Sequence, residues 1–335
     1  MTDPAHGPAV VAPDDFKGTF SAPEVAHAIA EGLREAGLEA VELPIADGGN
    51  GTMEAIVVGR GGEVRTATVP DAFGRPVECE WALLPDGETA VVEMAQASGL
   101  WRVPEEERTP ENAWRASTRG TGELIAEAAR AGARTVLVPV GGSATSDGGE
   151  GAIEALEEAG IDVNIEVICD VQVVFEDAPV VFGPQKGADP DMIARLIERL
   201  NEQAERAPKD PRGVPMTGAA GGLSGGLWAF RGARLVRGAP YVLDVLRFDE
   251  HLRGARFVVT GEGSLDDQTM TGKAVSEVAT RARQAGVPCH VVVGTNKLEP
   301  FKVRQLDLAS VHEATDLAEL HAAGLAIGRS FAAPG

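Results

Sequence analysis

The sequence predicts a fold of the α/β class, and three observations support this prediction. First, the chain opens with a short apolar run at residues 9–13, a helical pattern at 21–36, a strand-like segment at 39–44 and a second helix at 52–58. This alternation is typical of a parallel sheet. Second, three glycine-rich segments that carry carboxylates each follow an apolar run and precede a helix-like segment. Third, a chain of 335 residues is long for one core, so two domains are expected.

The first helix has clear start and stop signals. Ser21 and Glu24 have the spacing of a capping box, in which the serine caps the helix and the glutamate reaches back to the cap. Gly37 ends the pattern, because glycine readily adopts the left-handed conformation that follows many helices. We therefore expect a helix from Ser21 to about Ala36.

The rest of the chain continues the alternation after one change of character. Residues 64–69 and 78–84 alternate or run apolar around Pro-Asp-Gly turns, which predicts a β meander and a domain boundary near 65–70. A strongly patterned amphipathic helix is expected at 191–207. The remaining expected elements are helices at 121–131, 151–159 and 271–285 and strands at 134–140, 256–260 and 287–293.

The composition narrows the function classes. The chain has 51 acidic and 30 basic residues, a formal charge of −21, which argues against a general binder of nucleic acid or anionic membrane. No apolar run approaches the length of a membrane span. Residues 1–8 lack the basic start and apolar stretch of a signal peptide, so we expect a cytoplasmic protein. Cys79, Cys169 and Cys289 are too far apart for a zinc motif and are expected to be buried free thiols.

The three carboxylate segments are residues 47–52, 141–149 and 261–269. Glycine lets a backbone approach a ligand closely, and a loop at a helix N-terminus presents free N–H groups that suit phosphate. Carboxylates suit a hard cation such as Mg²⁺ or a hydroxyl that must lose a proton. Together the segments predict phosphoryl transfer to a small hydroxylated molecule. A single Asp-Gly-Gly is more often a plain turn, but three such segments at strand ends favour a site, because open α/β sheets bind ligands there.

Standard nucleotide motifs do not fit. Thr271, Gly272 and Lys273 do not complete a Walker A motif, because Asp267 stands where its first glycine belongs. No Gly-x-Gly-x-x-Gly follows the first strand, and the six histidines have no metal-like spacing. Lysine is scarce, yet Lys17, Lys186 and Lys273 each stand beside a glycine. For Lys17 a ligand role and a solvated surface position are equally open.

Seven motif-like segments occur between residues 9 and 296, nearly the whole chain: APDDFKG at 12–18, ADGGNGT at 46–52, EMAQASGL at 93–100, GGSATSDGG at 141–149, FGPQKGA at 182–188, GAAGG at 218–222 and TGEG at 260–263. In sequence and in order, these segments resemble the bacterial class I glycerate kinase family. The resemblance implies two α/β domains. One is a Rossmann-like parallel-sheet domain built from both chain ends, residues 1–68 and 255–335. The other is an inserted mixed α/β domain, residues 69–254.

The resemblance also implies a function. The expected reaction is ATP-dependent phosphorylation of D-glycerate with Mg²⁺, at the 2-hydroxyl, to give 2-phosphoglycerate and ADP. The sequence itself does not choose between the two hydroxyls of glycerate. The expected partners are glycerate and ATP, with no nucleic acid and no membrane, and both a monomer and a homodimer stay open.

Residue roles follow from the matching positions. Lys17 is expected to neutralise phosphate or the substrate carboxylate, and Asp47 to orient or deprotonate the attacking hydroxyl. Asp266 completes the expected catalytic set and, with Asp170, is expected near Mg²⁺; Asp147 is the other expected metal ligand. The expected substrate- and phosphate-binding residues are Asp14, Gly48, Gly49, Gly141, Gly142, Ser143, Thr145, Lys186, Gly261 and Glu262.

The chain departs from the family pattern near this predicted site. Asp15, Asn50, Ser146 and Ser264 stand where the family usually has Ser, Glu, Asn and Arg, and Gln172 begins a segment where a different turn is usual. These changes leave two alternatives open: a kinase for another small hydroxy acid, and a non-catalytic ligand-binding paralogue. The retained carboxylates and lysine argue against the second.

Overall fold

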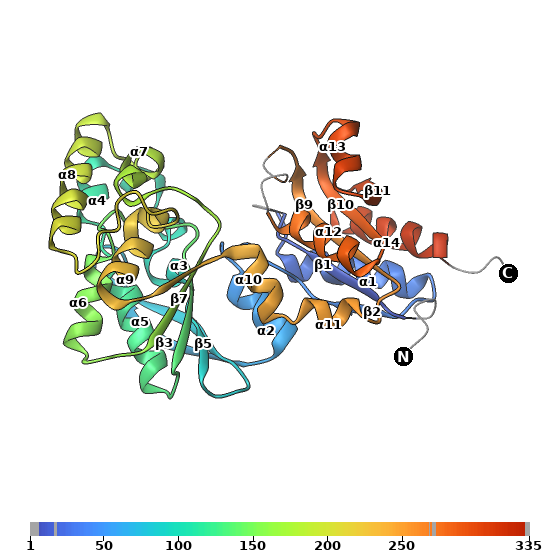
Figure 1. Cartoon of the computed structure of the whole chain (residues 1–335), viewed down its shortest axis with the longest axis horizontal. Helices are drawn as coiled ribbons and strands as arrows, with labels where there is room; N and C mark the ends of the chain where they lie inside the picture. The colour runs from blue at the N-terminus through green and yellow to red at the C-terminus, as the bar shows by residue number, and fades with distance from the viewer. Residues whose placement is uncertain (1–6, 17–18, 268, 270–272, 332–335) are drawn as a thin grey trace. The chain divides into compact units, whose positions relative to one another are not determined.

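The structure, a computed structural model, describes residues 7–16, 19–267, 269 and 273–331. The chain divides into two compact units. Unit 1 holds the chain up to Asp47, residues Glu54–Arg60 and the chain from Gly238; unit 2 holds Gly48–Met53 and Gly61–Arg237. Figure 1 shows the two chain ends, blue and red, in the same unit. The α/β class is confirmed, whereas the domain limits 1–68 with 255–335 and 69–254 stay a prediction.

Unit 1 is built on a five-stranded sheet in the order β11-β10-β9-β1-β2. Every neighbouring pair in this sheet is parallel. The strand β1 from the start of the chain lies beside β9 from its last third, with Ala9 opposite Phe257. The strands are β1 (Ala9–Pro13), β2 (Ala40–Glu42), β9 (Phe257–Leu265), β10 (Cys289–Asn296) and β11 (Leu308–Glu313).

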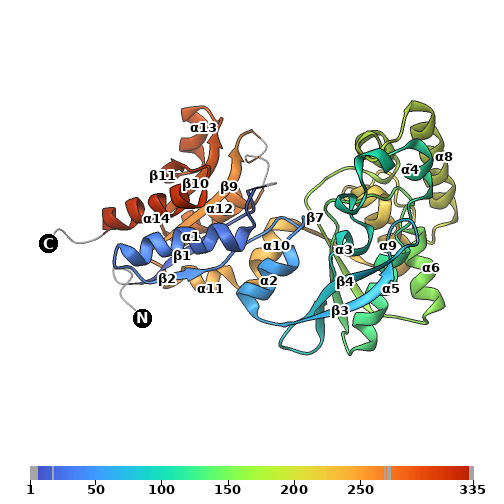
Figure 2. The same ribbon diagram turned by 180° about the vertical axis from the view of Figure 1, so that it is seen from behind.

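Helices cover both faces of this sheet. Figure 2 shows α1 and α14 in front of the strands, and Figure 1, from the opposite side, shows α12 in front. Successive side chains of a strand point to opposite faces of the sheet, so β10 contributes to two hydrophobic clusters. Val292 packs with α1 and α14 on one face, whereas Val291 and Val293 pack with α12 and α13 on the other. The helices are α1 (Ala22–Glu35), α2 (Thr52–Arg60), α10 (Gly238–Val245), α11 (Phe248–Leu252), α12 (Ala274–Ala285), α13 (Pro300–Gln305) and α14 (Leu317–Phe331).

The predicted start of α1 is confirmed. The Ser21 side chain accepts a hydrogen bond from the Glu24 N–H, and the Glu24 carboxylate accepts one from the Ser21 N–H at 2.8 Å. Both halves of the capping box are therefore present. The apolar face of the helix, including Val25, Ile29 and Leu33, is fully buried.

Unit 2 is built on a six-stranded mixed sheet in the order β3-β4-β5-β6-β7-β8. The β3-β4 and β4-β5 pairs are antiparallel, as the predicted meander requires, and the pairs from β5 to β8 are parallel. The strands are β3 (Glu63–Pro70), β4 (Pro76–Leu83), β5 (Thr89–Val91), β6 (Thr135–Pro139), β7 (Asn164–Cys169) and β8 (Arg234–Arg237).

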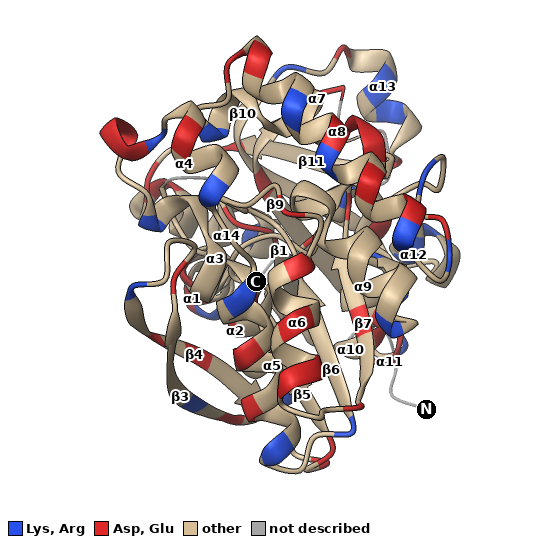
Figure 3. Cartoon of the chain, turned by 90° about the vertical axis from the view of Figure 1, so that its left-hand side faces the viewer, with Lys and Arg blue, Asp and Glu red and all other residues tan. Residues whose placement is uncertain are grey.

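The core of unit 2 lies between this sheet and helices. Leu124 and Ile125 from α5, Leu156 from α6 and Leu227 from α9 form one buried cluster with the strand residue Val138. The helices are α3 (Met94–Ser98), α4 (Pro110–Arg115), α5 (Arg119–Arg130), α6 (Glu150–Glu158), α7 (Ala178–Phe182), α8 (Pro190–Arg206) and α9 (Leu223–Arg231). Figure 3 shows bands of acidic residues on α6, and residues of both signs on α8.

One sequence prediction about the third carboxylate segment is wrong. It was expected to be a loop from Gly261 onward, but β9 continues to Leu265. The reason is that β10 stays paired with it, with Thr295 opposite Ser264 and Asn296 opposite Leu265. Gly261 allows this pairing, because a Cβ at this position would lie 2.2 Å from the carbonyl oxygen of Val292. The segment is therefore a strand end followed by a short turn.

Two other expectations concern the cysteines and the membrane. Cys79, Cys169 and Cys289 are free and buried, as predicted. In the part of the chain that the structure describes, no helix has both the length and the apolar character that a bilayer crossing requires. The predicted start of the helix at Thr271 lies outside the described residues, and α12 begins at Ala274.

Candidate active site

A pocket of about 440 Å³ lies in unit 1, where the strands of its parallel sheet end. Each of the five strands ends in, or leads into, a lining residue, which is the position at which open α/β sheets bind ligands. The volume suits a small molecule. The described lining residues are Asp14, Asp15, Phe16, Thr19, Asp47, Glu262, Gly263, Ser264, Asp266, Lys273, Gly294, Thr295 and Thr315.

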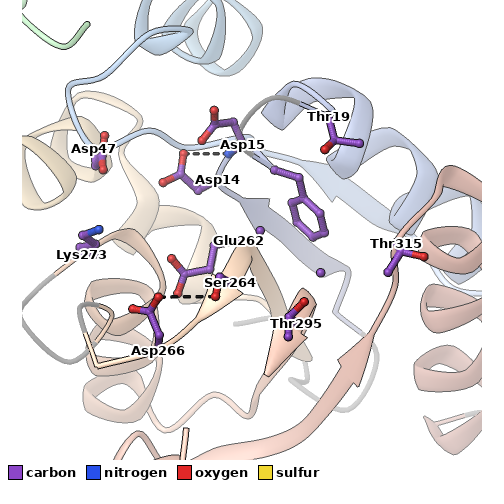
Figure 4. A pocket seen from close by; sticks show the side chains of 13 residues that line it. Asp14, Asp15, Thr19, Asp47, Glu262, Ser264, Asp266, Lys273, Thr295 and Thr315 are labelled. Carbon is purple, nitrogen blue, oxygen red and sulfur yellow. Dashed lines mark hydrogen bonds between the residues drawn. The ribbon is translucent and has the colours of Figure 1, made fainter. Parts of the chain in front are cut away.

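Carboxylates dominate this lining, as Figure 4 shows. Asp14 directly follows β1 and is buried, with its backbone N–H bonded to the Gly261 carbonyl at 2.8 Å. Asp47 follows four buried residues after β2 and is half-buried itself. Glu262 and Asp266 come from the end of β9 and the turn after it. Carboxylates from three segments that lie far apart in the sequence are thus brought to one pocket by the parallel strand order.

A short hydrogen-bond chain orders the carboxylates at the end of β9. The Thr269 hydroxyl donates to Glu262 Oε1 at 2.5 Å and accepts from the Asp266 N–H at 3.2 Å. Ser264 Oγ donates to Asp266 Oδ2 at 3.5 Å. The Asp15 N–H donates to Asp14 Oδ1 at 2.8 Å. These contacts orient carboxylate oxygens before any ligand arrives.

The glycine-rich segment 141–149 belongs to unit 2. Gly141 lies against the Gly48–Gly49 backbone: its N–H donates to the Gly48 carbonyl at 3.2 Å, and a Cβ at Gly141 would lie 2.5 Å from Gly49 Cα. Only glycine permits this approach. Gly142, whose φ is +71°, is exposed at the turn. The predicted phosphate-binding glycines at 48, 49, 141 and 142 are therefore neighbours within unit 2.

Asp147 is buried and fully engaged inside this loop. Its carboxylate accepts hydrogen bonds from the Thr118 N–H at 2.7 Å, the Thr118 hydroxyl at 2.9 Å, and the N–H groups of Gly149 and Gly151 at 3.1 and 3.3 Å. These hydrogen bonds give the Asp147 carboxylate a structural role, because they hold the loop in place. Its role as a metal ligand stays a prediction.

Lys186 lies buried beside the same loop. Its ammonium donates to Ser143 Oγ at 2.9 Å and to the Thr145 carbonyl. Burial lowers the pKa of Lys186 to about 7, although the nearby Asp147 carboxylate opposes this shift. In this loop and on Gln203, which donates to the Gly148 carbonyl, the buried atoms Thr145 Oγ1, Ser146 Oγ and Gln203 Oε1 have no hydrogen-bond partner among the described residues. Buried polar atoms are normally paired, so this cluster is suited to a polar ligand or water.

Two predicted residues remain to be placed. Asp170 directly follows β7 in unit 2 and is half-buried. Lys17 lies outside the described residues, so its role stays a prediction. Among the described residues, no three side chains of His, Cys, Asp or Glu form a ready-made metal cluster.

Sequence reasoning missed several lining residues. Gly294 and Thr295 directly follow the apolar run 291–293, so the rule that ligands bind at strand ends could have indicated them. Lys273 was noted for its neighbouring glycine and for an incomplete Walker A pattern, but no site role was predicted for it. Thr315 gave no usable signal, because β11 before it was not predicted.

Fold and site define the class of protein: an α/β enzyme with a carboxylate-rich pocket at the carboxyl ends of a parallel sheet. A model of the glycerate kinase family matches residues 9–162 and 157–326. The glycerate 2-kinase of Escherichia coli is 39% identical over 325 residues, covering 85% of this chain and 84% of that protein. The glycerate kinase of Halalkalibacterium halodurans is 40% identical, covering 85% of each.

A solved structure agrees with these matches. A crystal structure of a provisionally named glycerate kinase 2 from Salmonella typhimurium superposes with a TM-score of 0.81 at 34% identity, covering 97% of this chain and 96% of that one. The chain belongs to the glycerate kinase family, and it is an enzyme of the kinase class. The resemblance carried by the seven sequence segments is thereby confirmed.

Proposed function

We propose that this protein transfers the γ-phosphoryl group of ATP to the 2-hydroxyl of D-glycerate, giving 2-phosphoglycerate and ADP. The observation that carries this proposal is the pocket at the carboxyl ends of five parallel strands, where β1, β2 and β9 each lead to carboxylates. Family membership supports a kinase acting on glycerate, and the name of the Escherichia coli relative, glycerate 2-kinase, supports the choice of hydroxyl.

The proposed step is an in-line displacement. The glycerate 2-oxygen forms a bond to the γ-phosphorus while the bond from that phosphorus to the β–γ bridging oxygen breaks, and ADP leaves with that oxygen. The hydroxyl proton moves to the Asp47 carboxylate, which we assign as the base. Such catalysis depends mainly on positioning of the substrates and on charge stabilisation. The hydrogen-bonded carboxylates of the pocket are suited to positioning.

Mg²⁺ fits the donor set of this pocket. Carboxylate oxygens are the ligands that Mg²⁺ prefers, usually one or two together with waters and substrate phosphates. Asp14, Glu262 and Asp266 line one pocket. They do not form a ready-made three-residue cluster, so one or two of them would hold the ion together with waters and phosphate oxygens. When bound, the ion would offset phosphate charge. Asp170 and Asp147, the metal ligands expected from the resemblance, belong to unit 2.

Phosphate binding is assigned to two further features. The backbone N–H groups of Gly142, Ser143 and Thr145 and the side chains of Ser143 and Lys186 are suited to hold phosphate oxygens. The Thr145 hydroxyl, which has no hydrogen-bond partner among the described residues, supports this assignment. Lys17 is proposed as a further phosphate or carboxylate contact.

A kinase for another small hydroxy acid is the second candidate. Asp15 and Ser264, two of the positions where this chain departs from the usual family residues, both line the pocket. A change of lining charge can alter which acid fits.

A coupled assay of ADP release, run with MgATP and a panel of small hydroxy acids, separates these candidates. We expect D-glycerate to give the highest kcat/KM, and ³¹P NMR of the product to show 2-phosphoglycerate. A preference for another acid would support the second candidate. No ADP release with any acid would contradict a catalytic role. Reactions without an acceptor control for ATP hydrolysis.

A further inference from the structure

One cation in the pocket has no part in the proposed reaction so far. Lys273 is the only Lys or Arg among the described lining residues, and it faces a lining that contains five carboxylates. Figure 4 draws its ammonium group between Asp47 and Asp266, on the same side of the pocket as Asp47. A nucleotide phosphate that enters this pocket needs positive charge to offset those carboxylates, and Lys273 is a described source of it.

The backbone holds Lys273 in place. It is the residue before α12, in an extended conformation with φ −73° and ψ 176°. Its carbonyl accepts hydrogen bonds from the Ser276 hydroxyl at 2.9 Å and from the Glu277 N–H at 3.0 Å. The next two residues, Ala274 and Val275, are buried against unit 1. The side chain is therefore carried by a fixed helix start, and the positive end of the helix dipole adds to the same potential.

Other described lysines of unit 1 do not share this position. Lys302 forms an exposed ion pair with Asp267 at 2.6 Å, and neither residue lines the pocket. Lys297 is exposed after β10 and is also absent from the lining. Among the described lysines of unit 1, Lys273 is therefore distinguished by its place in the pocket lining.

We propose that Lys273 is a further catalytic residue, whose ammonium group contacts the phosphoryl group during its transfer. This inference rests on the proposed kinase function. Lys273 keeps its proton throughout: the O–P bond forms and breaks as described above, the hydroxyl proton goes to Asp47, and the lysine stabilises the charge on the phosphoryl oxygens. Because that charge is redistributed in the transition state, the contact affects turnover more than substrate binding.

The first test compares Lys273→Met with the matched control Lys302→Met. We expect Lys273→Met to lower kcat by about 10²–10³-fold, the range found when one preorganised charge-stabilising donor is removed, with a much smaller change in KM for glycerate. Lys302→Met is expected to keep wild-type kinetics. Lys273→Arg keeps the charge but replaces a compact ammonium with a wide planar group, so it should recover only part of the rate.

A chemical rescue distinguishes a charge contact from a structural role. Lys273→Cys, alkylated with 2-bromoethylamine, regains an ammonium group at nearly the original distance. The native thiols should not interfere, because all three are buried and burial raises the pKa of Cys169 and Cys289 to about 12. We expect the alkylated variant to recover a large part of the lost kcat, and the same variant treated with iodoacetamide to recover none.

The outcomes separate this inference from the proposed function. An active wild type with an equally active Lys273→Met would overturn the role of Lys273 alone. So would a folded, slow Lys273→Cys that alkylation with 2-bromoethylamine does not restore. An inactive wild type with every acceptor would overturn both proposals. If Lys273→Met does not fold, the Lys273→Cys pair gives the same decision, because its two alkylated forms differ only at the added group.

Discussion

At the scale of a single residue, the position of Asp47 supports the role of base that we propose for it. Buried Leu43, Ile45 and Ala46 anchor the segment before it, so the half-buried carboxylate has little part in the core. We predict that Asp47→Asn lowers kcat by about 10²–10⁴-fold, the usual contribution of general acid–base catalysis, without unfolding the protein. Steady-state kinetics and a thermal melt test this.

The control for Asp47 is Asp162→Asn, at an exposed position outside the pocket. It should keep both activity and stability. Near-wild-type turnover in folded Asp47→Asn would remove Asp47 from the base role.

Lys186 predicts a dependence of stability on pH. Burial lowers its folded pKa to about 7 from an ordinary 10.5. Below pH 7 both states carry the proton and the folded state bears the full cost of a buried charge. Between pH 7 and 10.5 the folded state loses the proton first, so stability rises with pH. The gain from pH 7 to 9 is up to about 2 kcal/mol, since one pKa unit corresponds to about 1.4 kcal/mol.

Urea unfolding at several pH values measures this effect as the difference between the wild type and Lys186→Met. The variant removes the ammonium group and keeps most of the apolar part of the side chain. Its free energy of unfolding should therefore rise less between pH 7 and 9 than that of the wild type. Equal slopes for both proteins would show that Lys186 remains charged when folded.

At the scale of elements, the pairing of β9 with β10 holds residues 261–265 of the third carboxylate segment in a strand. A Cβ at Gly261 would lie 2.2 Å from the Val292 carbonyl oxygen, a backbone atom that cannot turn away. Gly261→Ala should therefore push the two strands apart and destabilise the protein by about 1–3 kcal/mol, the usual cost of overpacking. The midpoint of urea unfolding measures it.

Thr295→Ala serves as the comparison for Gly261→Ala, because it lies on the neighbouring strand with an exposed side chain. It should change stability little. If Gly261→Ala were equally mild, the close approach of the two strands would not be a constraint on the fold.

The elements also show where sequence patterns succeed. The α1 helix was predictable because its capping box and the glycine after it are local signals. The capping box is present, and Gly37 has a φ of +85°. The end of β9 was not, because Gly261 and Gly263 look like a loop until β10 is placed beside them. β7, β11 and α14 were not predicted, although the buried residues of α14, among them Leu320, Ala323 and Ile327, have helical spacing.

At the scale of the whole molecule, unit 2 has a continuous core of its own. All members of its main buried cluster lie between Val69 and Ala233, and its six strands lie within residues 63–237. We predict that a fragment of residues 61–237 folds cooperatively, with a sigmoidal thermal transition by circular dichroism. A fragment of residues 1–60 should not fold, because β1 lacks its neighbour β9.

Leu124→Asp in the 61–237 fragment provides the control, because it places a charge at a fully buried core position and should abolish the transition. A fragment that melts without cooperativity, or one that Leu124→Asp leaves unchanged, would contradict an independent unit 2.

The sequence by itself determined the α/β class, the family and most candidate residues, because helix caps, strand periods and glycine-carboxylate segments are local patterns that can be read along the chain. It could not decide which of those residues share a pocket. Asp14, Asp47, Glu262 and Asp266 come together only because β1 pairs with both β2 and β9, a long-range pairing that no local pattern specifies. Tertiary packing likewise gave Asp147 four hydrogen-bond donors and buried Lys186, since burial depends on what the rest of the chain places around a side chain.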